Sequence, residues 1–151
     1  MDDGLELVAM DGDAVVALLD IDIDGPTATI DSIAVDPDRR RRGIATALLE
    51  RALTELPGSG VRLLEAWTRE DEPANGWYRR RGFRESQRYL HVYANGHEEV
   101  ARAMTAEPGL VAVHAFLHMV DMGRETEMRE RFGRVYVCRC YEREVGTRTG
   151  G

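Results

Sequence analysis

The chain has 151 residues, of which 43% are hydrophobic and 31% are charged, and its formal net charge at pH 7 is -7. This length suits one domain with a hydrophobic core of its own, and the acidity disfavours a dedicated nucleic-acid-binding protein. The longest apolar run, Leu110 to Val120, contains two histidines and is too short to cross a bilayer, so no membrane partner is expected. Lysine is absent, which fits either a G+C-rich genome or a salt-adapted surface.

The first residues and the two cysteines indicate in which cellular compartment the protein is found. Met1 to Gly4 is acidic and lacks the basic and apolar regions of a secretory signal. Cys138 and Cys140 are two residues apart, so on a strand they share a face and do not readily bridge each other. We therefore expect reduced core thiols and a cytoplasmic protein.

Three apolar runs open the chain. They cover Leu5–Met10, Val15–Ile23 and Thr27–Val35, and breaks containing aspartate and glycine separate them. Such breaks between extended runs are typical of hairpins. The sequence predicts an antiparallel meander that ends at Pro37, because proline cannot continue a central ladder.

A helix and a further strand follow. From Ile44 to Leu56, apolar side chains recur every three or four residues, and Pro57-Gly58 ends the pattern. Val61–Trp67 is typical of a strand, and strand, helix and strand in this order predict a right-handed parallel crossover. A second helix is expected to run to Arg81, with Asp71 as its N-cap.

The second half alternates between the two kinds of element. We expect strands at Arg84–Ala94, Leu110–Val120 and Arg134–Tyr141, and helices at His97–Ala106 and Thr126–Phe132.

A break at Asn95-Gly96 divides the chain. We predict a core over residues 1–96, followed by an α/β extension over 97–144 that completes the core or forms a dimer interface. A polar, flexible tail is expected over 145–151.

A basic turn lies between the third strand and the first helix. It reads Arg40-Arg41-Arg42-Gly43, and Ile44 begins the helix. A helix start carries free backbone N–H groups and the positive end of the helix dipole, and glycine lets a ligand approach the backbone. Guanidinium groups suit phosphate. The turn is therefore a candidate phosphate-binding site, although a run of arginines taken alone is as often a solvated loop.

Two further motifs accompany this turn. Ile33-Ala34-Val35-Asp36-Pro37 precedes it, and Trp77-Tyr78-Arg79-Arg80-Arg81-Gly82-Phe83 follows it downstream. In this order, the three resemble the GNAT superfamily of acetyl-CoA-dependent N-acetyltransferases. Arg40-x-x-Gly43-x-Ala45 is similar to the family's Arg/Gln-x-x-Gly-x-Gly/Ala signature, and the last motif to its Tyr-x-Lys/Arg-x-Gly-Phe ending. The resemblance covers roughly Leu5 to Ala94.

The resemblance implies an α/β fold, with a GNAT-like mixed sheet of an antiparallel meander plus a parallel β-α-β crossover, flanked by helices. The family usually begins with a strand and two helices that help to form the acceptor pocket, whereas this sequence begins at the meander. We therefore expect an N-terminally shortened member in which the extension or a second subunit fills the gap. A homodimer is the expected assembly, since symmetric dimers are the commonest closed solution.

Acetyl-CoA is the co-substrate that the resemblance implies, with no metal. In the family, the turn and the helix start hold the pyrophosphate of coenzyme A, and the preceding strand pairs with the pantetheine arm. The residues at these positions are Ile33, Ala34, Val35, Arg40, Arg41, Arg42, Gly43, Ile44, Ala45 and Thr46.

Tyr78 falls at the family's tyrosine, which is generally held to donate a proton to the coenzyme A sulfur. A phenol has a pKa near 10, so it remains a donor at neutral pH. Outside such a motif, a tyrosine at a helix end is more often a packing residue.

Glu65 is the first candidate for the general base. Strand alternation puts it on one face with Val61, Leu63 and Trp67, and a carboxylate buried on an apolar face suits a general base. A glutamate on this strand serves as the base in some relatives. Alternatively, Glu65 lies at the strand end and only meets water.

Other side chains are weaker candidates. Asp31 is the second candidate for the base and His91 the third. His114 and His118 are four residues apart, a spacing that could ligate a metal on a helix. The alternating pattern around Phe116 predicts a strand instead, where the two rings lie far apart, so we expect structural roles for both.

The sequence thus predicts an N-acetyltransferase that moves the acetyl group from acetyl-CoA to a primary amine of a small molecule or a peptide. The alternative is a non-catalytic acyl-CoA-binding regulatory module with the same fold, and consumption of acetyl-CoA would separate the two. A nucleic-acid-binding patch at Arg39–Arg42 is disfavoured by the overall acidity, so no nucleic-acid partner is expected.

Overall fold

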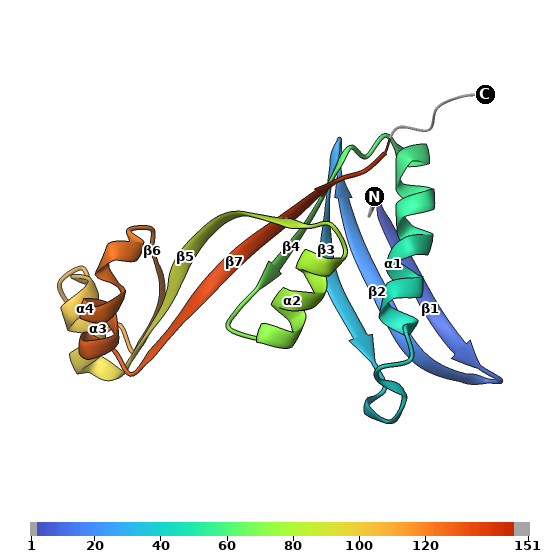
Figure 1. The fold of residues 1–151 in the computed structure, drawn as a ribbon. Coiled ribbons are helices and arrows are strands. Elements are labelled where there is room, and N and C mark those ends of the chain that lie inside the picture. Colours follow the sequence, from blue (N-terminus) through green and yellow to red (C-terminus); the bar gives the residue numbers. More distant parts are fainter. Residues whose placement is uncertain (1–2, 147–151) are drawn as a thin grey trace. The chain divides into compact units, whose positions relative to one another are not determined.

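The computed structural model describes residues 3–146, so most of the predicted tail lies outside the described residues. It is a mixed α/β fold with one seven-stranded sheet in the order β1-β2-β3-β4-β7-β5-β6, which confirms the predicted fold class (Figure 1). The strands are β1 (Gly4–Asp11), β2 (Ala14–Asp24), β3 (Thr27–Val35), β4 (Leu63–Thr68), β5 (Arg84–Asn95), β6 (His114–Met119) and β7 (Arg134–Glu144). The α-helices are α1 (Ile44–Glu55), α2 (Glu72–Arg80), α3 (Gly96–Ala103) and α4 (Glu125–Arg131), and short 3-10 turns cover Pro37–Arg39, Leu56–Ser59 and Met122–Arg124.

The chain forms two compact units. Within the described residues, the first unit contains 3–67, 76–84 and 141–146, and the second contains 68–75 and 85–140. This division follows compactness alone, and the boundary at residue 96 stays a prediction.

In the first unit, the meander and the crossover form as predicted. β1 pairs antiparallel with β2, and β2 pairs antiparallel with β3. β3 pairs parallel with β4, from Thr27 opposite Leu63 to Ile30 opposite Ala66. The helix α1 connects these two parallel strands.

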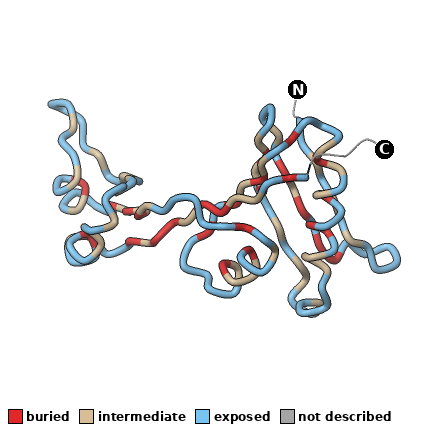
Figure 2. The backbone as a smooth tube through the Cα atoms, turned by 45° about the horizontal axis from the view of Figure 1, so that its top comes forward, coloured by how far each residue is buried: buried red, intermediate tan, exposed pale blue. Residues whose placement is uncertain are grey.

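The core of the first unit lies between the sheet and α1. Leu48, Leu49 and Ala52 are the buried residues of α1, and their spacing of three to four residues puts them on one side of the helix. They pack with buried sheet residues such as Ile21 and Leu64. Figure 2 shows these buried stretches in red along the strands and the inner side of α1.

Both ends of α2 are capped, and the residue at its start is the predicted N-cap. Asp71 Oδ1 accepts a hydrogen bond from the Ala74 amide at 3.2 Å, and this contact confirms Asp71 as the N-cap. At the other end, Gly82 has a φ of +87°, and the Phe83 amide donates to the Tyr78 carbonyl at 3.0 Å. A left-handed glycine closes a helix in this way.

In the second unit, α3 and α4 pack on one face of the strands. β5 and β6 are antiparallel, with His91 opposite His118. Alternate strand residues, including Leu90, Val92 and Val137, form a buried cluster with Val100 of α3 and with α4. Both histidines therefore lie on the other face of the sheet.

One strand predicted for the second half is shorter in the structure, and two further expectations can be compared with it. The predicted strand over 110–120 is limited to β6, because pairing with β5 ends at Asn95 opposite His114, where α3 begins. β6 and β7 both belong to this chain's own sheet. Cys138 and Cys140 are buried free thiols, as predicted.

Within residues 3–146, no helix combines the length and apolar character that crossing a membrane requires.

Candidate active site

A folded turn leads from β3 to α1. The Asp36 carboxylate accepts from the Asp38 amide at 3.0 Å and from Arg39 Nη1 at 3.0 Å. Arg39 Nη2 also donates to Asp11 at 3.0 Å. Arg39 therefore holds the turn together, and its guanidinium is occupied by two carboxylates.

Arg40, Arg41 and Arg42 are exposed. None of them forms an ion pair within the part of the chain that the structure describes. Arg41 is the one non-glycine residue between 3 and 146 with a positive φ, at 65°, a conformation that an arginine adopts only at a cost. Three unpaired guanidinium groups thus stand at a strained turn.

Gly43 joins this turn to the helix. Its φ is +75°, and a Cβ added there would meet no atom within 4 Å. Gly43 is also the N-cap of α1 and offers no side-chain cap, and the Ala47 amide donates to the Gly43 carbonyl at 3.0 Å. The amides of the first turn, at Ile44, Ala45 and Thr46, consequently have no helical partner. Free amides, the helix dipole and open space over a glycine fit the diphosphate of a coenzyme A molecule.

β3 and β4 stop pairing before the end of β3 that leads into this turn. Their parallel pairing stops at Ile30 and Ala66, whereas the pairing of β3 with β2 continues to Val35. Within residues 3–146, the edge of Ile33–Val35 that faces away from β2 therefore has no partner strand. This open edge can pair with an extended amide-containing arm, and no pattern in the sequence located where the two strands separate.

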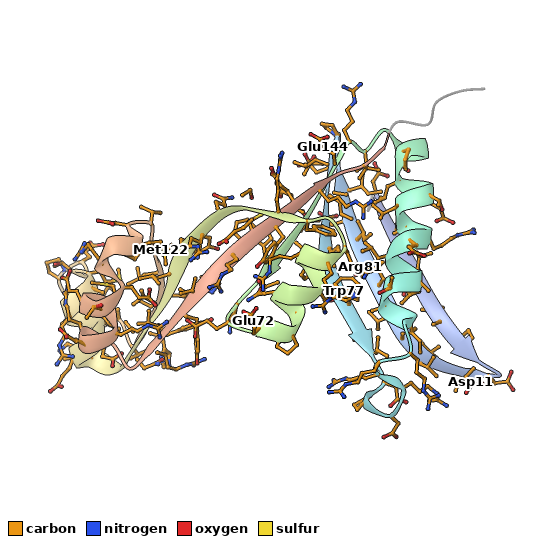
Figure 3. The ribbon with its side chains drawn as sticks, viewed as in Figure 1. Asp11, Glu72, Trp77, Arg81, Met122 and Glu144 are labelled. Atoms are coloured by element: carbon orange, nitrogen blue, oxygen red, sulfur yellow. The ribbon has the colours of Figure 1, made fainter. Side chains whose placement is uncertain are left out.

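The helix α2 is tied to the same end of α1. Trp77 Nε1 donates to Thr46 Oγ1 at 3.1 Å, and Figure 3 labels Trp77 on α2. Sequence reasoning missed this contact, because the two residues are 31 positions apart and neither motif indicates a side-chain bond.

Tyr78, the next residue, is buried in an aromatic cluster. Its ring stacks on Tyr141, with centroids 5.8 Å apart, and meets Phe83 edge-on at 5.1 Å. Burial raises the pKa of the Tyr78 phenol to about 12, so the hydroxyl stays protonated at neutral pH. That hydroxyl forms no hydrogen bond with the described residues, and its oxygen is not fully buried. It is an available proton donor.

Glu65 lies on a more open face than predicted. β4 begins at Leu63, so Val61 is not part of the strand. Leu64 and Ala66 form the buried face, whereas Glu65 is half-buried and its neighbour on the same face, Trp67, is 41% exposed. Glu65 thus lies between the two readings of the sequence, buried or at a solvated strand end, because the core of this unit forms on the other face.

Asp31 lies on the same sheet face as Glu65. Thr29, two residues before it, is opposite Glu65 in the parallel register, and partners in register share a face. Asp31 also lines a cavity of about 260 Å³ together with Asp20 and Asp22. This face is acidic and contains both carboxylates considered for the base.

His91 belongs to the second unit. It contacts Tyr89 and His118, and burial, then the positive charges of His118 and Arg69, lower its pKa. His114 and His118 lie on a strand, as predicted. Among the described residues, no group of three or more His, Cys, Asp or Glu side chains could hold a metal ion.

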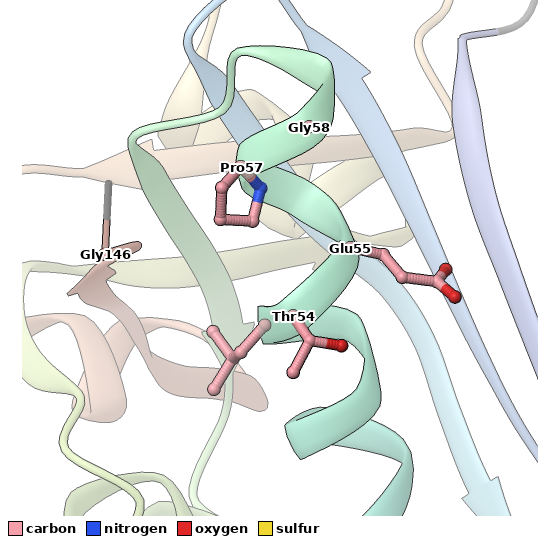
Figure 4. Close-up of a pocket in the computed structure, with 6 residues that line it drawn as sticks. Thr54, Glu55, Pro57, Gly58 and Gly146 are labelled. Carbon is pink, nitrogen blue, oxygen red and sulfur yellow. The ribbon is translucent and has the colours of Figure 1, made fainter. Parts of the chain in front are cut away.

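A separate depression lies at the far end of α1 (Figure 4). It is lined by Leu53, Thr54, Glu55, Pro57, Gly58 and Gly146. It lacks the arginines and the free helix amides of the turn, so it is not the candidate site.

Comparison with known proteins places the chain in a family. The model of the Acetyltransferase (GNAT) family matches residues 1–83. This is more than half of the chain, and the chain belongs to that family.

Among curated proteins, [Ribosomal protein bS18]-alanine N-acetyltransferase of Salmonella typhimurium is 38% identical over 98 residues, which cover 63% of this chain and 65% of that protein. The match thus spans less than two thirds of that relative's length.

Solved structures agree on the fold. The ribosomal-protein-S18-alanine N-acetyltransferase from Escherichia coli has a TM-score of 0.61 at 19% identity, covering 98% of this chain and 72% of that one. A GNAT family acetyltransferase from Elizabethkingia anophelis with acetyl-CoA bound has a TM-score of 0.58 at 14% identity, covering 93% and 76%. At such identities, the likeness shows the GNAT fold.

Proposed function

We propose that this chain is an acetyl-CoA-dependent N-acetyltransferase that acts on a primary amine, by preference the terminal amine of a peptide. One observation carries the proposal. The open edge of β3 at Ile33–Val35 runs into a helix start with free amides and three unpaired arginines. An extended amide arm that ends in a diphosphate, as in coenzyme A, suits this arrangement.

The cofactor would be held at two places. The backbone of Ile33, Ala34 and Val35 would pair with the pantetheine amides. The amides from Gly43 to Thr46 and the side chains of Arg40–Arg42 would hold the diphosphate. When bound, acetyl-CoA supplies an acetyl group activated as a thioester.

Tyr78 and Glu65 are the proposed proton carriers. The raised pKa of Tyr78 keeps its Oη protonated, so it can donate a proton to the departing thiolate. Glu65, half-buried, would accept a proton from the attacking amine directly or through a water molecule. Asp31 is the alternative base, because it shares the sheet face with Glu65.

The acceptor is proposed to be a peptide amine on two grounds. The cavity lined by Asp20, Asp22 and Asp31 would attract the ammonium form of an amine. The Salmonella relative carries the name of an alanine N-acetyltransferase of a ribosomal protein. The buried free thiols support a reducing compartment such as the cytoplasm.

A homodimer is also proposed. β6 ends the strand order of the sheet, and Leu110, Val111, Val113, Phe116 and Val120 are exposed in or beside it. An open strand edge with exposed apolar side chains favours pairing with a second copy. Sedimentation velocity over a range of concentrations would show a dimer, and a monomer at every concentration would contradict it.

Acetyl transfer can be tested with a panel of acceptors. The full chain is incubated with acetyl-CoA and peptides beginning with alanine, the same peptides with a blocked amino terminus, and small amines. We expect equal release of coenzyme A thiol and acetylated peptide, and no product from the blocked peptide. Binding of acetyl-CoA without consumption by any acceptor would favour the alternative of a non-catalytic acyl-CoA-binding module.

A further inference from the structure

The second unit contains a cavity that the proposed acetyl transfer does not use. It has a volume of about 350 Å³ and lies among α3, α4 and the strands β5 and β6. Its apolar lining includes Val92, Leu117, Met119, Met128 and Phe132. Methionines adapt their shape to irregular apolar ligands, and the volume falls within the range of small-molecule sites.

Three arginines also line this cavity, and no carboxylate does. They are Arg102 at the end of α3, Arg131 at the end of α4, and Arg124 just before α4. A cavity with an apolar floor and guanidinium groups in its wall is complementary to a molecule with an apolar chain and an anionic head.

Hydrogen bonds hold two of these arginines in place. Arg124 Nε and Nη2 each donate to the Glu127 carboxylate at 2.9 Å, and Arg131 Nη1 donates to it at 3.1 Å. Glu127 does not line the cavity. Glu127 thus positions two guanidinium groups with a single negative charge, and the charge of Asp121, which also does not line the cavity, acts on Arg124 as well.

Arg102 is the guanidinium with spare donors. Its Nη1 donates to the Arg131 carbonyl at 3.1 Å, and Arg131 Nη2 donates to the Arg102 carbonyl at 3.0 Å, so α3 and α4 are clasped together. Arg102 has no ion pair within residues 3–146. The nearby Glu99 carboxylate accepts from the amides of Asn95 and Gly133. A ligand carboxylate could therefore bond the remaining Arg102 N–H groups without breaking the clasp.

We propose that this cavity binds an amphiphilic anion, namely an unbranched aliphatic carboxylate. The aliphatic chain of the ligand lies along Leu117, Met119 and Met128, and its carboxylate meets Arg102 at the rim of the cavity. The proposal does not rest on the acetyltransferase activity, because every residue it uses belongs to the second unit.

The test uses the full-length protein with octanoate, 1-octanol and octylammonium. These three ligands have the same eight-carbon length and differ in the head group. Methyl resonances of the methionines report the site, with Met119 and Met128 in the cavity and Met10, on β1 of the first unit, as the internal control. We expect octanoate to shift the methyl resonances of Met119 and Met128 and to leave that of Met10 unchanged. The loss of a charge-assisted hydrogen bond should make 1-octanol bind about tenfold more weakly, and octylammonium more weakly still.

Variants separate the charge from the apolar floor. Arg102→Gln should weaken the binding of octanoate by about tenfold and leave the binding of 1-octanol unchanged. Arg124→Gln should independently have the same effect. Arg51→Gln, an exposed arginine on α1 that pairs with Glu55, should change neither. The proposal is overturned if octanoate fails to shift the two cavity methionines, whether the cavity stays closed or a second copy fills it. Binding of octylammonium as strong as that of octanoate would also overturn it.

Discussion

Trp77 Nε1 donates a hydrogen bond to Thr46 Oγ1 over 3.1 Å, and this bond joins α2 to the first turn of α1. Tyr78, the proposed acid, follows Trp77 directly on α2. Thr46 belongs to the helix start that would hold the cofactor's diphosphate. The helix that contains the proposed proton donor is therefore held by the end of α1 that is proposed to bind the diphosphate.

Breaking this bond should affect catalysis and stability together. Trp77→Phe and Thr46→Val each remove one partner, and we expect each to cost about 1 kcal/mol of unfolding free energy and to raise KM for acetyl-CoA. The double variant should cost less than the sum of the two, because both changes remove one bond. Denaturant unfolding and steady-state kinetics measure these effects, and strictly additive changes would show that the bond carries no coupling.

Tyr78→Phe should lower turnover by about a hundredfold and leave acetyl-CoA affinity nearly intact. The ring contacts with Tyr141 and Phe83 need no hydroxyl, so the fold should be preserved. Steady-state kinetics and calorimetric titration check the two halves of this expectation. Tyr136→Phe, in the second unit, is the control, and a Tyr78 variant as fast as the parent would leave Tyr78 as a packing residue.

Burial of Tyr78 also predicts a pH dependence of stability. Its pKa is raised from 10.0 to about 12 in the folded protein. The unfolded chain therefore loses the proton first as pH rises, and the stability present below pH 10 is lost towards pH 12. The contribution should fall by up to about 1.4 kcal/mol per pH unit in this window. Urea unfolding of the parent and of Tyr78→Phe at pH 8 and pH 11 measures it, and parallel losses in both proteins would contradict it.

Glu65→Gln should flatten the acidic limb of the pH–rate profile if Glu65 accepts the amine's proton. Asp31→Asn is the matched comparison, because it removes a carboxylate from the same sheet face. We expect the Asp31 change to leave the limb in place. The reverse pattern would transfer the base role to Asp31, and an unaltered limb in both variants would leave the proton to water.

Local patterns sufficed for most of the fold. The Val-, Leu- and Ile-rich composition of Val15–Ile23 and the three-to-four spacing in Ile44–Leu56 predicted β2 and α1 within one or two residues. The cap at Asp71 could be predicted because it depends on residues three or four positions away.

The sequence was a poor guide where contacts between residues far apart in the chain determine the local structure. Residues 110–113 are apolar but not in a strand, because β5 gives way to α3 opposite them. The burial of Glu65 stayed open in the sequence, because alternation identifies two faces without telling which one the core covers. The open edge of β3 was also invisible in the sequence, since it depends on where β4 stops pairing.

The central claim is that the turn before α1 binds the diphosphate of acetyl-CoA, and Gly43→Glu tests it most directly. A glutamate there would put a side chain and a negative charge into the open space over the helix start. Because Gly43 has a φ of +75°, the change also strains the backbone. Gly60→Glu is the matched control, since Gly60 has a φ of +80° and equally open surroundings at the other end of α1.

Calorimetric titration of the folded variants with acetyl-CoA decides the matter. We predict that Gly43→Glu abolishes binding, whereas Gly60→Glu retains the parent affinity and loses only stability. An unchanged affinity in a folded Gly43→Glu protein would contradict the assignment of the cofactor to this turn.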